Sequence, residues 1–250
     1  MLYKWASVLA AAVGIMSGLA APASAATVFL TDVSPSANMT ITFPGRPAET
    51  TPYVGHINWT FDRANADNAV LDTLVAGSSL TTFCIEGTQN VGIGQNSTYS
   101  SILTDLAGAP QDNVGSIYQM GAHAATLAMF WDAHYDDSMV SSANAAAFQL
   151  GVWEIVYDGG ILPDFAGGQF LASAVAGDAI SSDALALAQS WLGSLPNAVP
   201  SAHYQLYVLS DPSLQDQLFG VRAVPLPAAL PAGLSLLAGI AFLRRMRRRC

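Results

Sequence analysis

The segment at residues 145–158, AAAFQLGVWEIVYD, places the strongest constraint on how this chain can fold. It contains no proline and is predicted to be a helix, with apolar side chains around nearly all of its circumference. Glu154 and Asp158, one turn apart, form a narrow polar strip, and Gln149 lies among apolar residues. Such a helix must be buried on most sides, so we expect the rest of the domain to surround it.

Predicted strands and helices follow one another in three blocks. Strands are expected at 26–33, 37–43, 53–61, 79–86, 203–210 and 217–223, where β-branched and aromatic residues gather. Helices are expected at 114–134, 145–158 and, as one or two helices, within 167–195. The glycine- and asparagine-rich stretch at 87–100 is expected to be a loop. This order predicts an α+β fold, with strand-rich N- and C-terminal parts around a central, mostly buried helical segment.

The first 25 residues have the layout of a secretory signal peptide. Lys4 precedes an apolar run, and Ala23, Ser24 and Ala25 form an A-x-A cleavage site. The alternative is an N-terminal membrane anchor, but the apolar run is short for a span. We therefore expect residues 1–25 to be removed and the following chain to be exported.

The last 27 residues, 224–250, also have three parts. VPLPAALPAG is followed by an apolar stretch that ends at Leu243 and then by five arginines, which would stay on the cytoplasmic side of a membrane. This layout resembles the VPLPA variant of the P-E-P C-terminal sorting domains, with Val224, Pro225, Leu226 and Pro227 as the motif. The resemblance implies a bacterial protein, transiently anchored in the inner membrane, that an exosortase-type transpeptidase transfers to the cell surface. The alternative is an ordinary tail anchor.

The remaining segment, 26–223, is long enough for a domain with a real core and is strongly acidic. All 18 Asp and Glu residues lie in it, against Arg46, Arg63 and Arg222, and it contains no lysine. An acidic surface repels nucleic acid and attracts cations or basic partners. Nucleic acid is therefore excluded as a partner, although acidity also serves solubility.

Cys84 is the only cysteine in this segment, because Cys250 follows the cytoplasmic arginines. Exported proteins usually pair their cysteines or omit them. Cys84 is therefore a buried apolar filler, a nucleophile, or a residue covalently occupied by something other than sulfur. Similarly, the buried amide of Gln149 needs hydrogen-bond partners, which a loop backbone alone could provide.

A thiol and a carboxamide held together can form an internal thioester with loss of ammonia, because proximity supplies a high effective concentration. FCIE at 83–86 and FQLGVWEI at 148–155 resemble the two motifs of the thioester domains of bacterial surface adhesins. The resemblance implies a thioester-domain-like fold in which Cys84 supplies the sulfur and Gln149 the acyl group. Phe148 and Gly151 depart from the pattern, which has threonine and alanine there.

The same resemblance implies the surroundings and the partner of the bond. Phe83 and Trp153 would shield it, and Glu86 or Glu154 would orient a neighbour or take a proton. An amine-bearing surface protein or matrix component would attack the Gln149 carbonyl and become attached once, so the chain would be an adhesin or coupling module and not an enzyme. The alternative is a noncovalent structural envelope or exopolysaccharide-matrix protein, with Cys84 and Gln149 as core residues.

Other chemistry has weaker support in the sequence. No cofactor is expected, and no metal, because neither the acidic stretch at 132–137 nor that at 61–68 has the spacing of a calcium loop. A cysteine hydrolase would need a histidine beside Cys84, which the sequence alone does not exclude.

Overall fold

A computed structural model describes residues 25–103, 106, 109, 120–160, 164–195 and 203–223. The sorting segment at 224–250 and all but the last residue of the predicted signal peptide lie outside these ranges. Among the helices within the described ranges, none has both the length and the apolar character needed to cross a bilayer.

The described chain contains both strands and helices, as predicted. The strands are β1 (Ala26–Asp32), β2 (Ser36–Thr42), β3 (Glu49–Gly55), β4 (Ile57–Thr60), β5 (Ser79–Cys84), β6 (Asn96–Tyr99), β7 (Ser101–Leu103), β8 (Leu171–Ala174), β9 (Tyr204–Asp211) and β10 (Leu214–Arg222). The helices are η1 (Ala66–Asn68), α1 (Ala69–Leu74), α2 (Met120–Ser138), α3 (Ser142–Asp158) and α4 (Ala179–Ser194). The α+β class expected from the sequence is confirmed.

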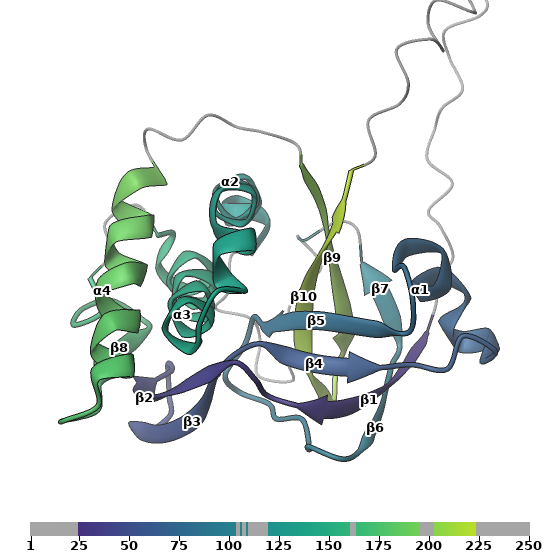
Figure 1. Ribbon diagram of the computed structural model, residues 1–250, viewed down its shortest axis with the longest axis horizontal. Helices are drawn as coiled ribbons and strands as arrows, with labels where there is room; N and C mark the ends of the chain where they lie inside the picture. Colours follow the sequence, from purple (N-terminus) through teal and green to yellow (C-terminus); the bar gives the residue numbers. More distant parts are fainter. Residues whose placement is uncertain are drawn as a thin grey trace, which may run out of the picture.

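A seven-stranded antiparallel sheet forms one half of the molecule, in the order β6-β1-β4-β5-β10-β9-β7 (Figure 1). Its two edge strands, β6 and β7, are separated in the chain only by Ser100, so the sheet curls until it is nearly a closed barrel. The Tyr99 hydroxyl donates to the Gln215 carbonyl at 3.0 Å across this curled sheet.

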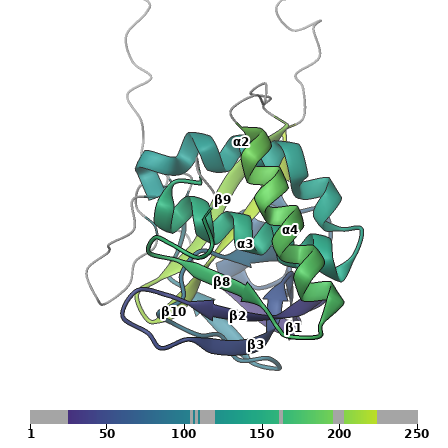
Figure 2. The ribbon, with the colours of Figure 1, turned by 90° about the vertical axis from the view of Figure 1, so that its left-hand side faces the viewer.

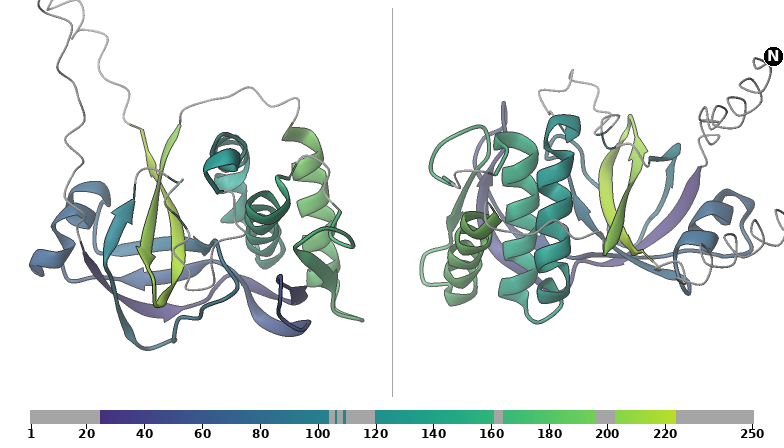
Figure 3. Two further views of the ribbon diagram at one scale, coloured as in Figure 1. Left: turned by 180° about the vertical axis from the view of Figure 1, so that it is seen from behind. Right: turned by 90° about the horizontal axis from the view of Figure 1, so that it is seen from above.

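The helices α2, α3 and α4 lie side by side next to this barrel, above a small sheet of order β3-β2-β8 (Figures 1 and 2). The helix α3 is central: it contacts α2, α4, the small-sheet strands β2 and β3, and β5 of the barrel, and it runs between α2 and α4 in Figure 3. Every residue from Ala145 to Tyr157 is buried. The prediction of a central, mostly buried helix is therefore confirmed. Its N-cap is Ser141 and its C-cap is Gly159.

The chain passes from one sheet to the other through short connections after β1 and after β3. The single strand predicted at 53–61 is wrong, because the chain leaves the small sheet at Gly55 and enters the barrel at Ile57. At the crossing the His56 N–H donates to the Pro35 carbonyl at 3.1 Å. A Cβ on Gly55 would lie 2.3 Å from that same oxygen, so only glycine permits so close an approach.

Two further expectations from the sequence are corrected. The predicted loop at 87–100 ends in strand β6, which pairs with β1. The region expected to be only helical at 167–195 contains strand β8, which completes the small sheet by pairing with β2. In both cases pairing with a strand far away in the sequence decides the conformation. Of the helix predicted at 114–134, the part before Met120 lies outside the described residues.

Candidate functional site

Cys84 is the last residue of β5, at a point where β5 still pairs with β10 on one side but no longer with β4 on the other. The ladder between β4 and β5 begins at Ile57, which pairs with Thr82, so β4 does not reach Cys84. On the opposite side, β10 still pairs with Cys84 through Gln217, and the Ile85 N–H donates to the Asp216 carbonyl. Because backbone groups alternate along a strand, the N–H and C=O of Cys84 point toward the unpaired side.

Gln149 from α3 occupies that unpaired side. The Cys84 N–H donates to Gln149 Oε1 at 2.9 Å, and Gln149 Nε2 donates to the Cys84 carbonyl at 2.8 Å. Both residues are buried, and the amide takes the place of a missing strand. The structure thus brings together two residues that are 65 positions apart in the sequence. The amide carbonyl is held against the same residue that carries the thiol.

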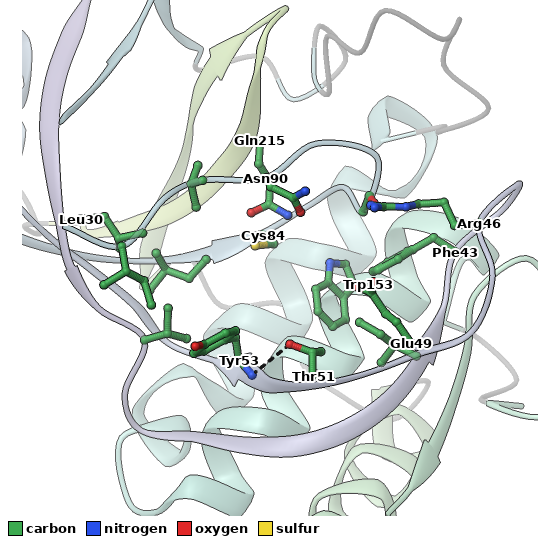
Figure 4. Close-up of a pocket in the computed structure, with 16 residues that line it drawn as sticks. Leu30, Phe43, Arg46, Glu49, Thr51, Tyr53, Cys84, Asn90, Trp153 and Gln215 are labelled. Carbon is green, nitrogen blue, oxygen red and sulfur yellow. Dashed lines mark hydrogen bonds between the residues drawn. The ribbon is translucent and has the colours of Figure 1, made fainter. Parts of the chain in front are cut away.

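The sulfur of Cys84 faces a cavity of about 390 Å³ where the two sheets diverge. Residues of β1, β2, β3, β4, α3, β10 and the loop after β5 line this cavity. Its lining residues are Leu30, Val33, Ile41, Phe43, Arg46, Glu49, Thr51, Tyr53, Ile57, Cys84, Gly87, Asn90, Val91, Ile93, Trp153 and Gln215. In Figure 4, Cys84 lies at the back of the cavity between Asn90 and Trp153, with Tyr53 and Thr51 across from it. A small molecule in the cavity could therefore reach the sulfur.

Trp153 forms a wall of this cavity and lies one turn of α3 after Gln149. Its ring packs edge-on against Phe43, with 5.1 Å between ring centroids, and it is 4% exposed. The indole Nε1 has no hydrogen-bond partner among the described residues. In Figure 4 the nitrogen-bearing edge of the ring faces the cavity. An indole N–H can only donate, so Trp153 Nε1 is a buried donor without a partner among the described residues.

The electrostatic environment of Cys84 does not favour the free thiolate. Burial, together with the nearby Glu86 and against an amide hydrogen bond from Gln217, raises the pKa of the Cys84 thiol to about 12. Cysteine hydrolases depend on a lowered thiol pKa. The raised pKa disfavours any reaction that starts from a free Cys84 thiolate, including that of a cysteine hydrolase.

The other predicted site residues lie around this pair but do not line the cavity. Phe83 points into an aromatic cluster, with its ring centroid 4.6 Å from that of Phe148. Glu86 Oε1 accepts from the Asp216 N–H at 3.0 Å, and Glu154 Oε1 accepts from the Asp164 N–H at 3.4 Å. Glu86 therefore holds the backbone of β10 and Glu154 that of the segment at Asp164, and neither carboxylate contributes to the surface of the cavity.

Phe148 and Gly151, the two residues that depart from the thioester-domain pattern, both pack against the ring of Phe130 on α2. The ring centroids of Phe130 and Phe148 are 4.9 Å apart. A Cβ on Gly151 would lie 2.2 Å from the Phe130 Cζ atom. An aromatic ring from α2 therefore fills the space above both positions of α3, and glycine at 151 is what lets it do so.

The Gly151→Ala substitution should consequently destabilise the protein, by about 1–3 kcal/mol, because the added methyl group overpacks the contact with Phe130. Urea unfolding measures this. The matched control is Gly193→Ala in α4, where nothing lies within 4 Å of an added Cβ and helix propensity favours alanine by up to about 1 kcal/mol. Equal effects of the two substitutions would contradict this packing.

Glu154 should make stability depend on pH. Burial, followed by the Asp158 and Asp164 carboxylates, raises the pKa of Glu154 from 4.5 to about 7, and Oε2 has no hydrogen-bond partner among the described residues. Because the folded-state pKa is the higher one, the folded protein keeps a proton that the unfolded chain has released. The free energy of unfolding should therefore fall as the pH rises from 4.5 through about 7.

The Glu154→Gln substitution should flatten this decline and stabilise the protein above neutral pH, by at most about 3 kcal/mol. Urea unfolding across this pH range is the measurement. The same pH dependence in wild-type and Glu154→Gln protein would show that another group is responsible.

Gln217 is a residue of this site that the sequence did not single out. It is fully buried on β10, and its Nε2 lies 3.8 Å from the Cys84 sulfur as a hydrogen-bond donor. A signal was present in the sequence, since Gln217, like Gln149, is an amide next to apolar residues of a predicted element.

The acidic stretches have structural roles. Asp132 accepts from the backbone N–H groups of His203 and Tyr204, at 3.2 and 3.0 Å, and Asp136 pairs with Arg222 at 2.6 Å. These contacts fix α2 against β9 and β10. Within the described ranges, no group of three or more His, Cys, Asp or Glu side chains could hold a metal ion.

Comparison with known proteins gives no further assignment. No family model, no curated protein and no solved structure matches the chain.

Proposed function

We propose that this chain is an exported surface protein with a thioester-domain-like fold that attaches covalently to amine-bearing partners through a Cys84–Gln149 thioester. The contact between the Gln149 amide and Cys84, at the back of a cavity that reaches the sulfur, is the observation that carries the proposal. The paired motifs FCIE and FQLGVWEI also support it.

The first step forms the bond. The Cys84 sulfur adds to the side-chain carbonyl carbon of Gln149, and the C–N bond breaks. The thiol proton ends on the departing nitrogen, which leaves as ammonia. Negative charge develops on Gln149 Oε1 during this step, and the Cys84 N–H already donates to that oxygen at 2.9 Å. A donor fixed in advance lowers the barrier as in an oxyanion hole.

The second step attaches the partner. A primary amine that enters the cavity attacks the Gln149 carbonyl, an amide bond forms, and Cys84 is released as a thiol. The apolar lining, including Phe43 and Trp153, slows hydrolysis by limiting the water around the thioester. Lys4 is the only lysine of the chain and lies in the predicted signal peptide, so no lysine amine of the mature chain competes for the bond.

A noncovalent role in the envelope or exopolysaccharide matrix is the second candidate function. One observation favours it: the two hydrogen bonds to Cys84 already satisfy the Gln149 amide in the folded interior. In that case the pair acts only as a substitute for strand pairing at the end of β5.

Incubation of the mature protein with a biotin-tagged primary alkylamine separates the two functions. We expect one equivalent of amine to be incorporated at Gln149, located by peptide mass spectrometry, with the Cys84 thiol released for alkylation. A tagged tertiary amine of equal charge, which cannot form an amide, is the reagent control.

The protein control is Cys84→Ala, which retains the Gln149 amide but provides no sulfur. Incorporation into Cys84→Ala at the wild-type rate, or no incorporation into wild-type protein that has lost ammonia, would refute the covalent function.

A further inference from the structure

We infer that Gln217 is a positioning residue for the Cys84 sulfur, which it stabilises whenever the sulfur carries negative charge. This inference rests on the proposed function for its chemical role, but its physical basis is a buried hydrogen-bond chain that exists independently. Trp59, Thr82 and Gln217, all buried, form the chain, and it ends at Cys84.

The hydrogen bonds of this chain run from Trp59 toward Cys84. Trp59 Nε1 can only donate, so the Thr82 hydroxyl accepts from it at 2.9 Å. The hydroxyl donates to Gln217 Oε1 at 2.7 Å, which is shorter than its 3.4 Å contact with the Ile57 carbonyl. With its oxygen held in this way, the amide of Gln217 presents its nitrogen to the Cys84 sulfur at 3.8 Å.

The second proton of the Gln217 amide is also used. Nε2 donates to the Gln215 carbonyl at 3.2 Å, within the same strand β10. Both ends of the amide are thus held, because a flip would turn Oε1 toward the Gln215 carbonyl, an acceptor facing an acceptor, and would remove the 2.7 Å bond from the Thr82 hydroxyl. Buried polar groups that lose their partners in this way are costly, so the nitrogen stays directed at the sulfur.

A donor at this position acts on the sulfur in the second step of the proposed reaction. When an amine attacks the thioester, the bond between the Gln149 carbonyl carbon and the Cys84 sulfur breaks, and the electron pair moves to sulfur. The amine proton ends on the thiol. Burial disfavours negative charge on the Cys84 sulfur. The Gln217 N–H stabilises that charge as it develops, through a hydrogen bond to the sulfur.

The test uses Gln217→Met, which keeps the length of the side chain but removes the donor. Aminolysis of the thioester by the tagged alkylamine should slow about tenfold, the effect of losing one hydrogen bond to a charged group. Gln205→Met is the matched control. It alters an exposed glutamine on β9 that does not line the cavity, and its rate should stay within about threefold of wild type.

A second arm measures the free thiol and does not depend on thioester formation. In the Gln149→Ala background, adding Gln217→Met should slow alkylation of Cys84 by iodoacetamide and by the bulkier N-ethylmaleimide by the same factor, about tenfold, at every pH below the thiol pKa. A merely structural effect on access would change the two reagents unequally. Thr82→Val removes the hydroxyl that donates to Gln217 Oε1, and it should also slow alkylation by both reagents. This variant replaces Gln217→Met in the test if Gln217→Met does not fold.

The outcomes separate this inference from the function on which it rests. If wild-type protein forms no thioester but Gln217→Met still slows both alkylations equally, the function fails and the role of Gln217 stands. If the thioester forms and neither Gln217→Met nor Thr82→Val changes aminolysis or alkylation, the role of Gln217 is overturned.

Discussion

Phe148→Ala should lower the free energy of unfolding of the mature protein by about 3–5 kcal/mol, the range for a fully buried phenylalanine. Phe148 is completely buried, and its ring packs against Phe83, Phe130 and Trp131, with centroid distances of 4.6, 4.9 and 5.2 Å. This cluster joins α3 to β5 and α2. Its loss would loosen the contact between the helix that carries Gln149 and the strand that carries Cys84.

Urea unfolding measures the effect, and Phe29→Ala on β1 is the matched control. Phe29 is 38% exposed, so the loss of its ring should cost about 1 kcal/mol or less. If Phe148→Ala proved no more destabilising than Phe29→Ala, the aromatic cluster would not be what holds α3 against the barrel.

Gln149→Leu should abolish covalent capture of amines and also destabilise the fold. Leucine has no carbonyl group for the sulfur to attack. It also leaves the buried N–H and C=O of Cys84 without the partners that now lie at 2.9 and 2.8 Å. Each unpaired buried group costs about 1–3 kcal/mol. Amine incorporation and urea unfolding provide the two measurements.

The matched control is Gln205→Leu, an exposed glutamine on β9, which should leave both capture and stability nearly unchanged. Amine incorporation by Gln149→Leu at the wild-type rate would show that the acyl group comes from another residue. Unchanged stability would show that water replaces the amide beside Cys84.

The sequence predicted the structure best where the pattern of residues within a single element determines its conformation. The apolar circumference of residues 145–158 predicted the buried helix α3, and the order of blocks predicted the α+β class. Cys84 and Gln149 do lie together, through the Gln149 amide and the Cys84 backbone, whereas the expected contact of the sulfur with the Gln149 carbonyl carbon stays a prediction. Their actual contact, side-chain amide to strand backbone, depends on where β4 begins, and no local pattern encodes that.

What the sequence did not indicate depends on contacts between distant segments. Strand β8 was hidden in a helix-like region because its pairing with β2 exists only in the folded chain. Gln217 looked like an ordinary polar residue at the start of a predicted strand. It becomes part of the site only because β10 pairs with β5 at Cys84 and because Thr82 orients its amide.

The most direct test of the Cys84–Gln149 bond is the intact mass of the mature protein, measured without reducing agent and before any amine is added. The thioester predicts a mass lower by one ammonia than the sequence requires, and the full sequence mass, with no such loss, in both Cys84→Ala and Gln149→Ala. Wild-type protein at its full sequence mass, with a Cys84 thiol that alkylates once unfolded, would contradict the thioester and leave the noncovalent envelope protein as the function.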